Sequence, residues 1–220
     1  MGERSSTPRH ESRWPPALTV LTIVAWLMLL PERMRALPIW GMPAIAIILL
    51  APMVGVMLAR SKAPWLRLER VVTVLFSCLV EVLVVEWLRR LVFAIVYRSS
   101  EVSGHWLLST AIAAWICNVL AFSLLYWQID RGGPSGRAVR TDVKPDWLFA
   151  QEGAGDAVPA DWRPTFVDYL FLAFTTATAF SPTDAPPLTS RAKMLMLTES
   201  TLSLAMLVIV ASRAINILGS

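Results

Sequence analysis

The stretch FVDYLFLAFTTATAFSPTD (166–184), followed after a proline-containing bend by LTSRAKMLMLTESTLSLAMLVIVASRAIN (188–216), decides the fold predicted for this chain. Residues 165–177 predict a helix of about 20 Å at about 1.5 Å per residue. That is too short for a bilayer core of about 30 Å, whereas 190–217 is long enough to span it. Non-helical backbone at membrane depth must be buried in protein or line a water-filled cavity. The stretch therefore indicates a re-entrant pore loop followed by an inner helix.

The composition of the chain is that of a membrane protein. Of 220 residues, 55% are hydrophobic and only 16% are charged, and the mean hydropathy is +0.56. The net charge is only +4 and the basic residues lie between apolar runs, so no nucleic-acid partner is expected. Cys78 and Cys117 both fall in apolar runs, which argues against a disulfide scaffold.

Four further apolar runs precede the pore-loop stretch, at 17–30, 38–59, 71–97 and 104–128. They predict an all-α integral membrane protein with five transmembrane helices plus a re-entrant pore helix and pore loop. We divide it into an N-terminal four-helix membrane region (1–128), a polar turret-like loop (129–163), and a pore helix, filter-like loop and inner helix (164–220). A basic connector is expected at 60–70. Within the long loop, Trp147-Leu148-Phe149 is expected to touch the membrane interface.

Six polar residues of the last region follow the spacing of a known pore module: Asp168, Thr178, Asp184, Lys193, Glu199 and Arg213. Laid without a gap, they fall on the leading acid, the filter threonine, the acid that closes the filter, and the basic residue, glutamate and arginine of the inner helix. The region therefore resembles the pore module of the potassium-channel family in its bacterial two-transmembrane form. It also resembles a family of small bacterial membrane proteins of unknown function, which share the pattern D-x-L-Y-F-S-F-T…F-x-x-x-D.

The sequence departs from the potassium-channel pattern at the filter itself, where Ser181, Pro182 and Thr183 replace Gly-Tyr-Gly. A potassium filter stacks backbone carbonyls toward the axis, using glycines that tolerate left-handed dihedrals. Pro182 fixes φ near −65° and removes a donor, and a β-branched Thr183 disfavours positive φ. The resemblance therefore implies weakly selective conduction of alkali cations through a non-canonical filter. The alternative is a non-conducting scaffold or regulatory subunit that retains the channel fold.

The end of the predicted pore helix is rich in hydroxyls, at Thr175, Thr176 and Thr178. They are expected to line an ion entry, with the C-terminal helix dipole favouring a cation; alternatively they satisfy the last carbonyls of a buried helix. Asp184 is expected to form a ring of carboxylates in a homotetramer, because a single pore loop cannot enclose a conduit. Alternatively it is a turn residue, before a helix capped by Thr189 or Ser190.

Charges inside the predicted spans are costly and are therefore candidates for function. Glu199 is expected to face the ions or to brace the pore helix, unless it only bonds a hydroxyl of its own helix. The third span contains four more charges, at Glu81, Glu86, Arg89 and Arg90. Glu86 lies four residues before Arg90, the favourable order for an ion pair, with Arg89 reaching an interface. Glu81 lacks a partner at helical spacing and is a candidate to face Asn118.

The sequence contains few features typical of an enzyme, and we expect no catalytic residue, metal site or cofactor. The only histidines are His10 and His105, and no cysteine–histidine group has metal-ligand spacing. We expect a bacterial plasma (inner) membrane protein. The positive-inside rule, applied to 60–70, places the long loop and filter in the cytoplasm. The channel resemblance implies an external filter, and from the sequence that is the orientation we expect.

Overall fold

The fold is described from a computed structural model, which covers residues 11–29, 41–58, 63–97, 104–139, 143–159, 162–179 and 185–218. The predicted filter strip Ser181–Pro182–Thr183–Asp184 lies outside the described residues, as does the side chain of Arg213. The main helices are α1 (Trp14–Leu29), α2 (Gly41–Leu58), α3 (Ala63–Tyr97), α4 (Gly104–Ile129), α5 (Gly133–Val139), α6 (Phe166–Ala179) and α7 (Ser190–Leu218).

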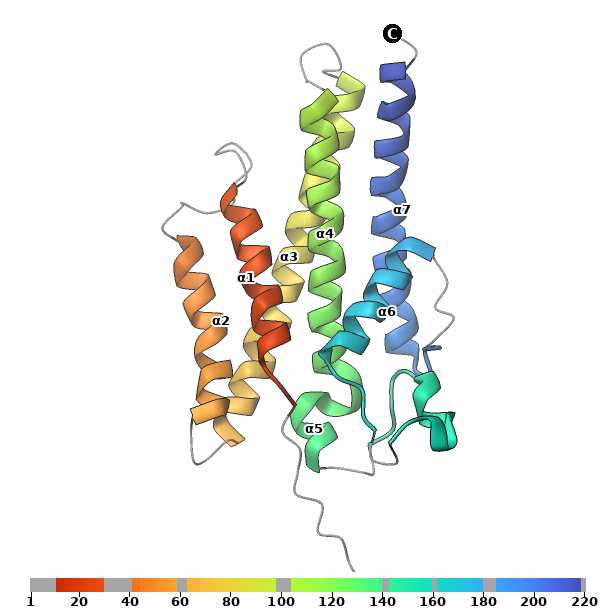
Figure 1. Cartoon of the computed structure of the whole chain (residues 1–220). Helices are drawn as coiled ribbons and strands as arrows, with labels where there is room; N and C mark the ends of the chain where they lie inside the picture. Colours follow the sequence, from red (N-terminus) through yellow and green to blue (C-terminus); the bar gives the residue numbers. More distant parts are fainter. Residues whose placement is uncertain are drawn as a thin grey trace, which may run out of the picture.

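The helices form a bundle in which α4 is central and packs against α1, α3, α6 and α7. Figure 1 shows α3 and α7 beginning, and α4 ending, at one end of the bundle, which we call the lower end. Alanines of α4 are fully or almost fully buried at positions 111, 113, 114 and 121. Small residues of this kind let helix backbones approach closely, which is the usual way for membrane helices to associate.

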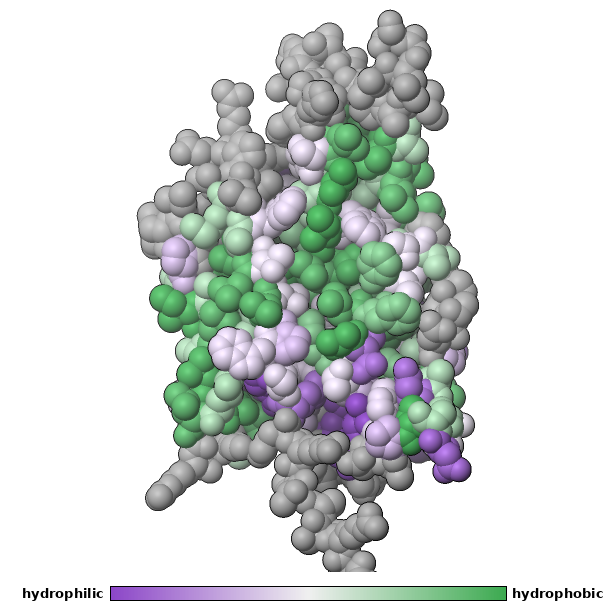
Figure 2. Space-filling view, in the orientation of Figure 1, coloured by the Kyte–Doolittle hydropathy of each residue, from purple (hydrophilic) through white to green (hydrophobic). Residues whose placement is uncertain are grey.

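Three helices are long and apolar enough to cross a membrane, over Ala63–Ile95, Leu107–Arg137 and Ser190–Ser212. The shorter apolar helices cover Trp14–Met28, Pro43–Leu58 and Phe166–Ala179. The described chain is therefore all-helical, with the helix lengths and composition of a membrane protein. Figure 2 shows apolar residues over the middle of the visible face and hydrophilic residues gathered toward the lower end.

Helix α6 has 14 residues, about 21 Å of helix, and is shorter than a bilayer core. It begins at the lower end, and α7 also begins there, so the chain enters and returns at one end (Figure 1). Asp168 accepts hydrogen bonds from the Thr165 backbone N–H (2.7 Å) and hydroxyl (2.8 Å), which caps the start of α6. The Thr189 hydroxyl accepts from the Ala192 N–H at 3.3 Å, as predicted for the cap of α7.

Two expectations about the connecting segments are wrong. Helix α3 begins at Ala63, so much of the predicted connector at 60–70 is helical. The two aromatic residues of the long loop's island do not lie on an outer surface, because Trp147 is fully buried and Phe149 nearly so, and only Leu148 between them is exposed, at 44%. The Trp147 indole packs 4.7 Å from the Tyr126 ring and donates to the Met196 sulfur at 3.1 Å. An indole that finds both an apolar pocket and a hydrogen-bond acceptor gains more from burial than from the interface.

Candidate functional site

Two polar groups of residues interrupt the apolar interior. The first, which we call the inner cluster, consists of Glu81 of α3, Asn118 and Tyr126 of α4, and Glu199 and Ser203 of α7. The second, the lower cluster, consists of Asp130, Arg137, Asp146, Tyr169 and Arg191. Polar groups removed from water are costly unless they are paired, so each cluster requires a physical explanation.

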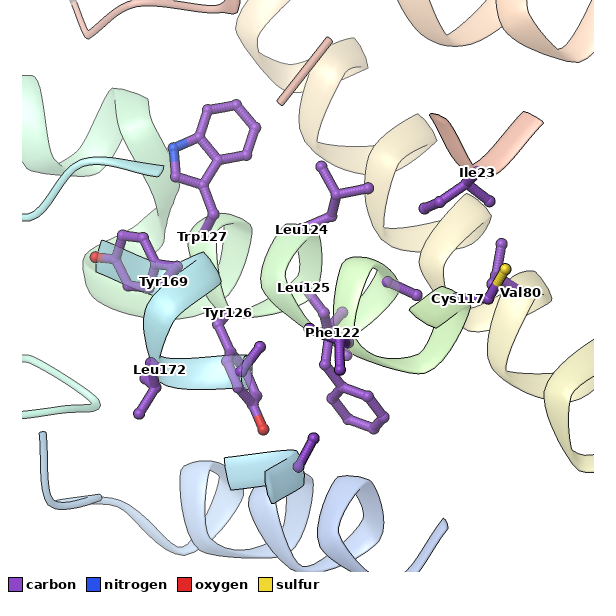
Figure 3. Close-up of a cluster of buried hydrophobic side chains, with 14 of the residues drawn as sticks. Ile23, Val80, Cys117, Phe122, Leu124, Leu125, Tyr126, Trp127, Tyr169 and Leu172 are labelled. Carbon is purple, nitrogen blue, oxygen red and sulfur yellow. The ribbon is translucent and has the colours of Figure 1, made fainter. Parts of the chain in front are cut away.

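Glu199 lies at the centre of the inner cluster and is fully buried. The Tyr126 hydroxyl donates a short hydrogen bond to Glu199 Oε2, and Figure 3 shows that hydroxyl directed toward α7. Asn118 donates its amide to Ser203 Oγ at 3.0 Å and to the Glu199 carbonyl at 3.5 Å. The sequence led us to expect that Glu199 faces the ions or braces the pore helix, and the partner found for its carboxylate is Tyr126 of α4. Its partner is not a hydroxyl of its own helix.

Glu81 lies within electrostatic range of Glu199, Tyr126 and Cys117. Both of its carboxylate oxygens are buried, and neither has a hydrogen-bond partner among the described residues. Glu81 was predicted to face Asn118, but no hydrogen bond joins them among the described residues, and the Asn118 amide donates to α7. The second oxygen of Glu199 and the Asn118 carbonyl oxygen are likewise buried without a described partner. The inner cluster therefore has spare capacity for hydrogen bonds, as a site for water or small cations requires.

The threonines of α6 divide into two kinds. The Thr175 hydroxyl donates to Phe171 and Leu172 carbonyls, both at 3.0 Å, and Thr178 donates to Phe174 at 2.7 Å. These two follow the alternative in which hydroxyls satisfy carbonyls of their own helix. Thr176 differs, because its Oγ1 is buried without a described partner.

The carbonyl of Thr176 accepts from the Ser200 hydroxyl at 3.3 Å, which ties the end of α6 to α7. Ser200 adjoins Glu199, so the C-terminal end of α6 lies next to the inner cluster. The structure thereby brings together two groups of predicted site residues that are separated in sequence, the α6 threonines and Glu199.

The remaining intramembrane charges form a separate group near the other end of α3. Glu86 accepts from Arg89 at 2.7 and 2.8 Å and from Arg90 at 2.7 Å. The predicted Glu86–Arg90 pair is present, and Arg89 shares the same carboxylate instead of reaching away from it. All three side chains are exposed or partly exposed. Exposed pairs of this type contribute little and satisfy one another locally, so this group is a structural feature of α3.

The lower cluster is built around Asp130, which is fully buried just after α4. Its carboxylate accepts from the Tyr169 hydroxyl of α6 at 2.6 Å and from the Asp146 backbone N–H at 2.7 Å. Arg137 donates to the backbone carbonyls of Trp127 (2.9 Å) and Asp130 (3.0 Å), and its guanidinium lies 4.9 Å from the Tyr169 ring. The end of α4, the long loop and the start of α6 are therefore joined at one carboxylate.

Asp146 extends the lower cluster to the first turn of α7. It is fully buried and accepts from Arg191 Nε at 2.6 Å and Nη2 at 2.5 Å, a bidentate pair, and from the Thr189 hydroxyl at 2.6 Å. Its backbone carbonyl accepts from the Leu188 N–H at 2.7 Å. The long loop thus holds the start of both α6 and α7.

A left-handed turn directly after Asp130 brings the long loop back to its carboxylate. Arg131, Gly132 and Gly133 have φ of 52°, 77° and 80°, which end α4 and turn the chain into α5. A Cβ on Gly133 would lie 2.9 Å from the Gln128 carbonyl oxygen and would have a φ that disfavours side chains. The three residues turn the chain so that the loop folds back under the bundle.

The sequence interpretation missed the lower cluster. Asp130, Asp146 and Tyr169 come from three segments and share no periodicity that would mark them as neighbours. The available signal was the position of Asp130 directly after an apolar helix and before a run of glycines.

No group of three or more histidine, cysteine, aspartate or glutamate side chains in the described part of the chain is arranged to hold a metal ion. Comparisons with family models, with curated proteins and with solved structures find no match to this chain. The function must therefore be argued from the two clusters and the short helix α6.

Replacing Asp130 by alanine is expected to destabilise the protein strongly. It leaves the Tyr169 hydroxyl and the Asp146 N–H buried without their acceptor, and loss of one partner in a buried charged network costs about 3–5 kcal/mol. Thermal unfolding in detergent measures the effect. Asp156→Ala is the matched control: Asp156 is exposed in the same loop, and its loss should change stability by less than about 0.5 kcal/mol. Equal melting temperatures for the two variants would contradict the role given to Asp130.

Proposed function

We propose that this chain is a pore-loop, ion channel-like membrane protein that conducts cations with weak selectivity through a non-canonical filter. In this proposal α1, α2, α3, α4 and α7 are five transmembrane helices and α6 is the re-entrant pore helix. The observation that carries the proposal is the geometry of α6: it is too short to span a bilayer, and it begins at the same end of the bundle as α7. A bacterial inner membrane fits the apolar composition and helix lengths.

The exposed faces of α6 and α7 support assembly into a homotetramer. Apolar side chains on these faces are 48–60% exposed in the single chain, at Val167, Phe171, Phe174, Met194, Leu197, Leu204 and Val208. The hydroxyl-bearing Thr178, Thr198 and Thr201 are exposed on the same two helices. Four copies around an axis would cover the apolar positions and turn hydroxyls toward a conduit. A monodisperse particle of one chain mass in native mass spectrometry would rule out this assembly.

Orientation follows from where the basic residues gather. The described lower end contains Arg13, Arg67, Arg70, Arg131, Arg137, Lys144, Arg163, Arg191 and Lys193. Arg89 and Arg90 lie toward the other end of α3 and Arg213 lies near the end of α7, and the segments joining α1 to α2 and α3 to α4 contain only Arg33, Arg35 and Arg98. The positive-inside rule counts lysines and arginines near the ends of spans. We therefore propose a cytoplasmic lower end, opposite to the orientation implied by the channel resemblance. Labelling of Ser135→Cys in intact cells by an impermeant reagent would refute it.

A non-conducting scaffold or regulatory subunit is the second candidate. The observation that favours it is that Thr175 and Thr178, which an ion entry would use, donate their hydroxyls to carbonyls of their own helix. Pro182 in the adjoining strip also prevents a ladder of filter carbonyls. On this alternative the fold is retained as a platform for protein contacts.

Purified protein in liposomes is expected to pass potassium and sodium at similar rates, and both faster than chloride. Without a carbonyl ladder the ions keep most of their water, so a charged mouth gives charge preference with little size selection. Asp184→Asn is expected to remove most of the preference for cations over anions, most clearly at low ionic strength, where carboxylates are least screened. Asp156→Asn is the control and should leave fluxes unchanged. No flux above empty liposomes would favour the scaffold, and strong potassium selectivity would show that the argument from Pro182 is wrong.

A further inference from the structure

A stripe of polar residues follows one buried face of α3. Glu69, Thr73, Ser77 and Glu81 recur every fourth residue, which places them on one side of the helix over a rise of about 18 Å. Glu69, Thr73 and Ser77 are 1%, 1% and 0% exposed. An apolar helix buries such a stripe at a considerable cost unless the polar groups have partners.

The hydroxyls in this stripe differ from several hydroxyls of the other helices. Thr19, Thr198 and Thr201 each donate to the carbonyl four residues earlier, at 3.1, 2.9 and 2.7 Å. Thr176, beside the inner cluster, resembles the stripe instead, because its buried hydroxyl has no described partner. The Thr73 and Ser77 hydroxyls make no hydrogen bond to any described residue, although both are buried. Buried polar side chains without protein partners usually bond to internal water.

The two ends of the stripe meet the two clusters already described. At the lower end Glu69 pairs with Arg13 at 3.0 Å and lies within electrostatic range of Glu11 and Arg137. At the upper end Glu81 lies within range of Cys117, Tyr126 and Glu199. Arg13 is the cation that pairs directly with Glu69 in the described part of the chain. The hydroxyls of Thr73 and Ser77 are thus the intermediate polar positions between two buried carboxylates.

We propose that Glu69, Thr73, Ser77 and Glu81 line a narrow water-filled track inside each subunit, which gives the inner cluster access to water and protons from the lower end. The Arg13–Glu69 pair lies at the lower entrance, and the Glu81 and Glu199 carboxyl groups receive the protons. The track passes within one chain beside α4. It is therefore separate from the conduit between subunits, and it does not require that conduit to open.

Substituted cysteines test the track. In a background with Cys78 and Cys117 replaced by alanine, Ser77→Cys and Thr73→Cys are made singly and treated in liposomes with a small, water-soluble methanethiosulfonate. The matched controls are Leu91→Cys and Ala94→Cys, which are buried on the same helix at 0% and 8% exposure but lie in a separate apolar cluster beyond Glu81, past the end of the track. These reagents attack the thiolate, which forms only where water reaches the sulfur.

We expect positions 73 and 77 to react at least tenfold faster than positions 91 and 94, and only with reagent supplied on the side of the lower end. Equal rates at all four positions, or reaction from the opposite side alone, would overturn the proposal. The result does not depend on ion conduction, because reactive positions without alkali-cation flux would support the track while refuting the pore. Flux with unreactive positions would do the reverse. Thermal unfolding of each variant confirms that it is folded before its rate is interpreted.

Discussion

The carboxylate of Asp130 holds the lower end of the bundle together. It binds the Tyr169 hydroxyl of α6 and the backbone of the long loop, while Asp146 of that loop binds Arg191 of α7. Helices α6 and α7 are thereby fixed to the end of α4. In the proposed pore-loop arrangement α6 ends inside the bilayer, where lipid cannot support its buried end, so its position would depend on contacts of this kind. The long loop provides these contacts.

The inner cluster differs from the lower cluster in one respect that bears on function. In the lower cluster every carboxylate oxygen of Asp130 and Asp146 accepts a hydrogen bond from another segment, although the buried Nε of Arg137 has no described partner. In the inner cluster Glu81 and one oxygen of Glu199 have no described partner. Saturated buried networks rigidify a protein, whereas unsaturated ones are where water or ions are expected. The structure thus separates a rigid support at the lower end from a site with unused polar capacity at the centre.

Much of the helical framework was predictable, because apolar runs and caps are local. The predicted helix at 104–128 is found at Gly104–Ile129, and Thr189 caps α7 as expected. The Glu86–Arg90 pair was likewise predictable from helical spacing. The lower cluster and the burial of Trp147 were not, since they depend on a left-handed turn that folds the loop back under the bundle. Burial of Glu199 was predictable, but its Tyr126 partner lies on a helix distant in sequence and no spacing rule connects them.

The central claim is that α6 enters the membrane and that the chain returns to the side from which it came. Single cysteines at Thr165 and Leu188, both exposed at the two ends of the re-entrant segment, test it most directly when compared with Ser220, which follows α7. In a cysteine-free background, an impermeant maleimide is expected to label positions 165 and 188 from one side of the membrane and position 220 from the other. Labelling of positions 165 and 188 from opposite sides would mean that α6 crosses the bilayer, and it would contradict the pore-loop account.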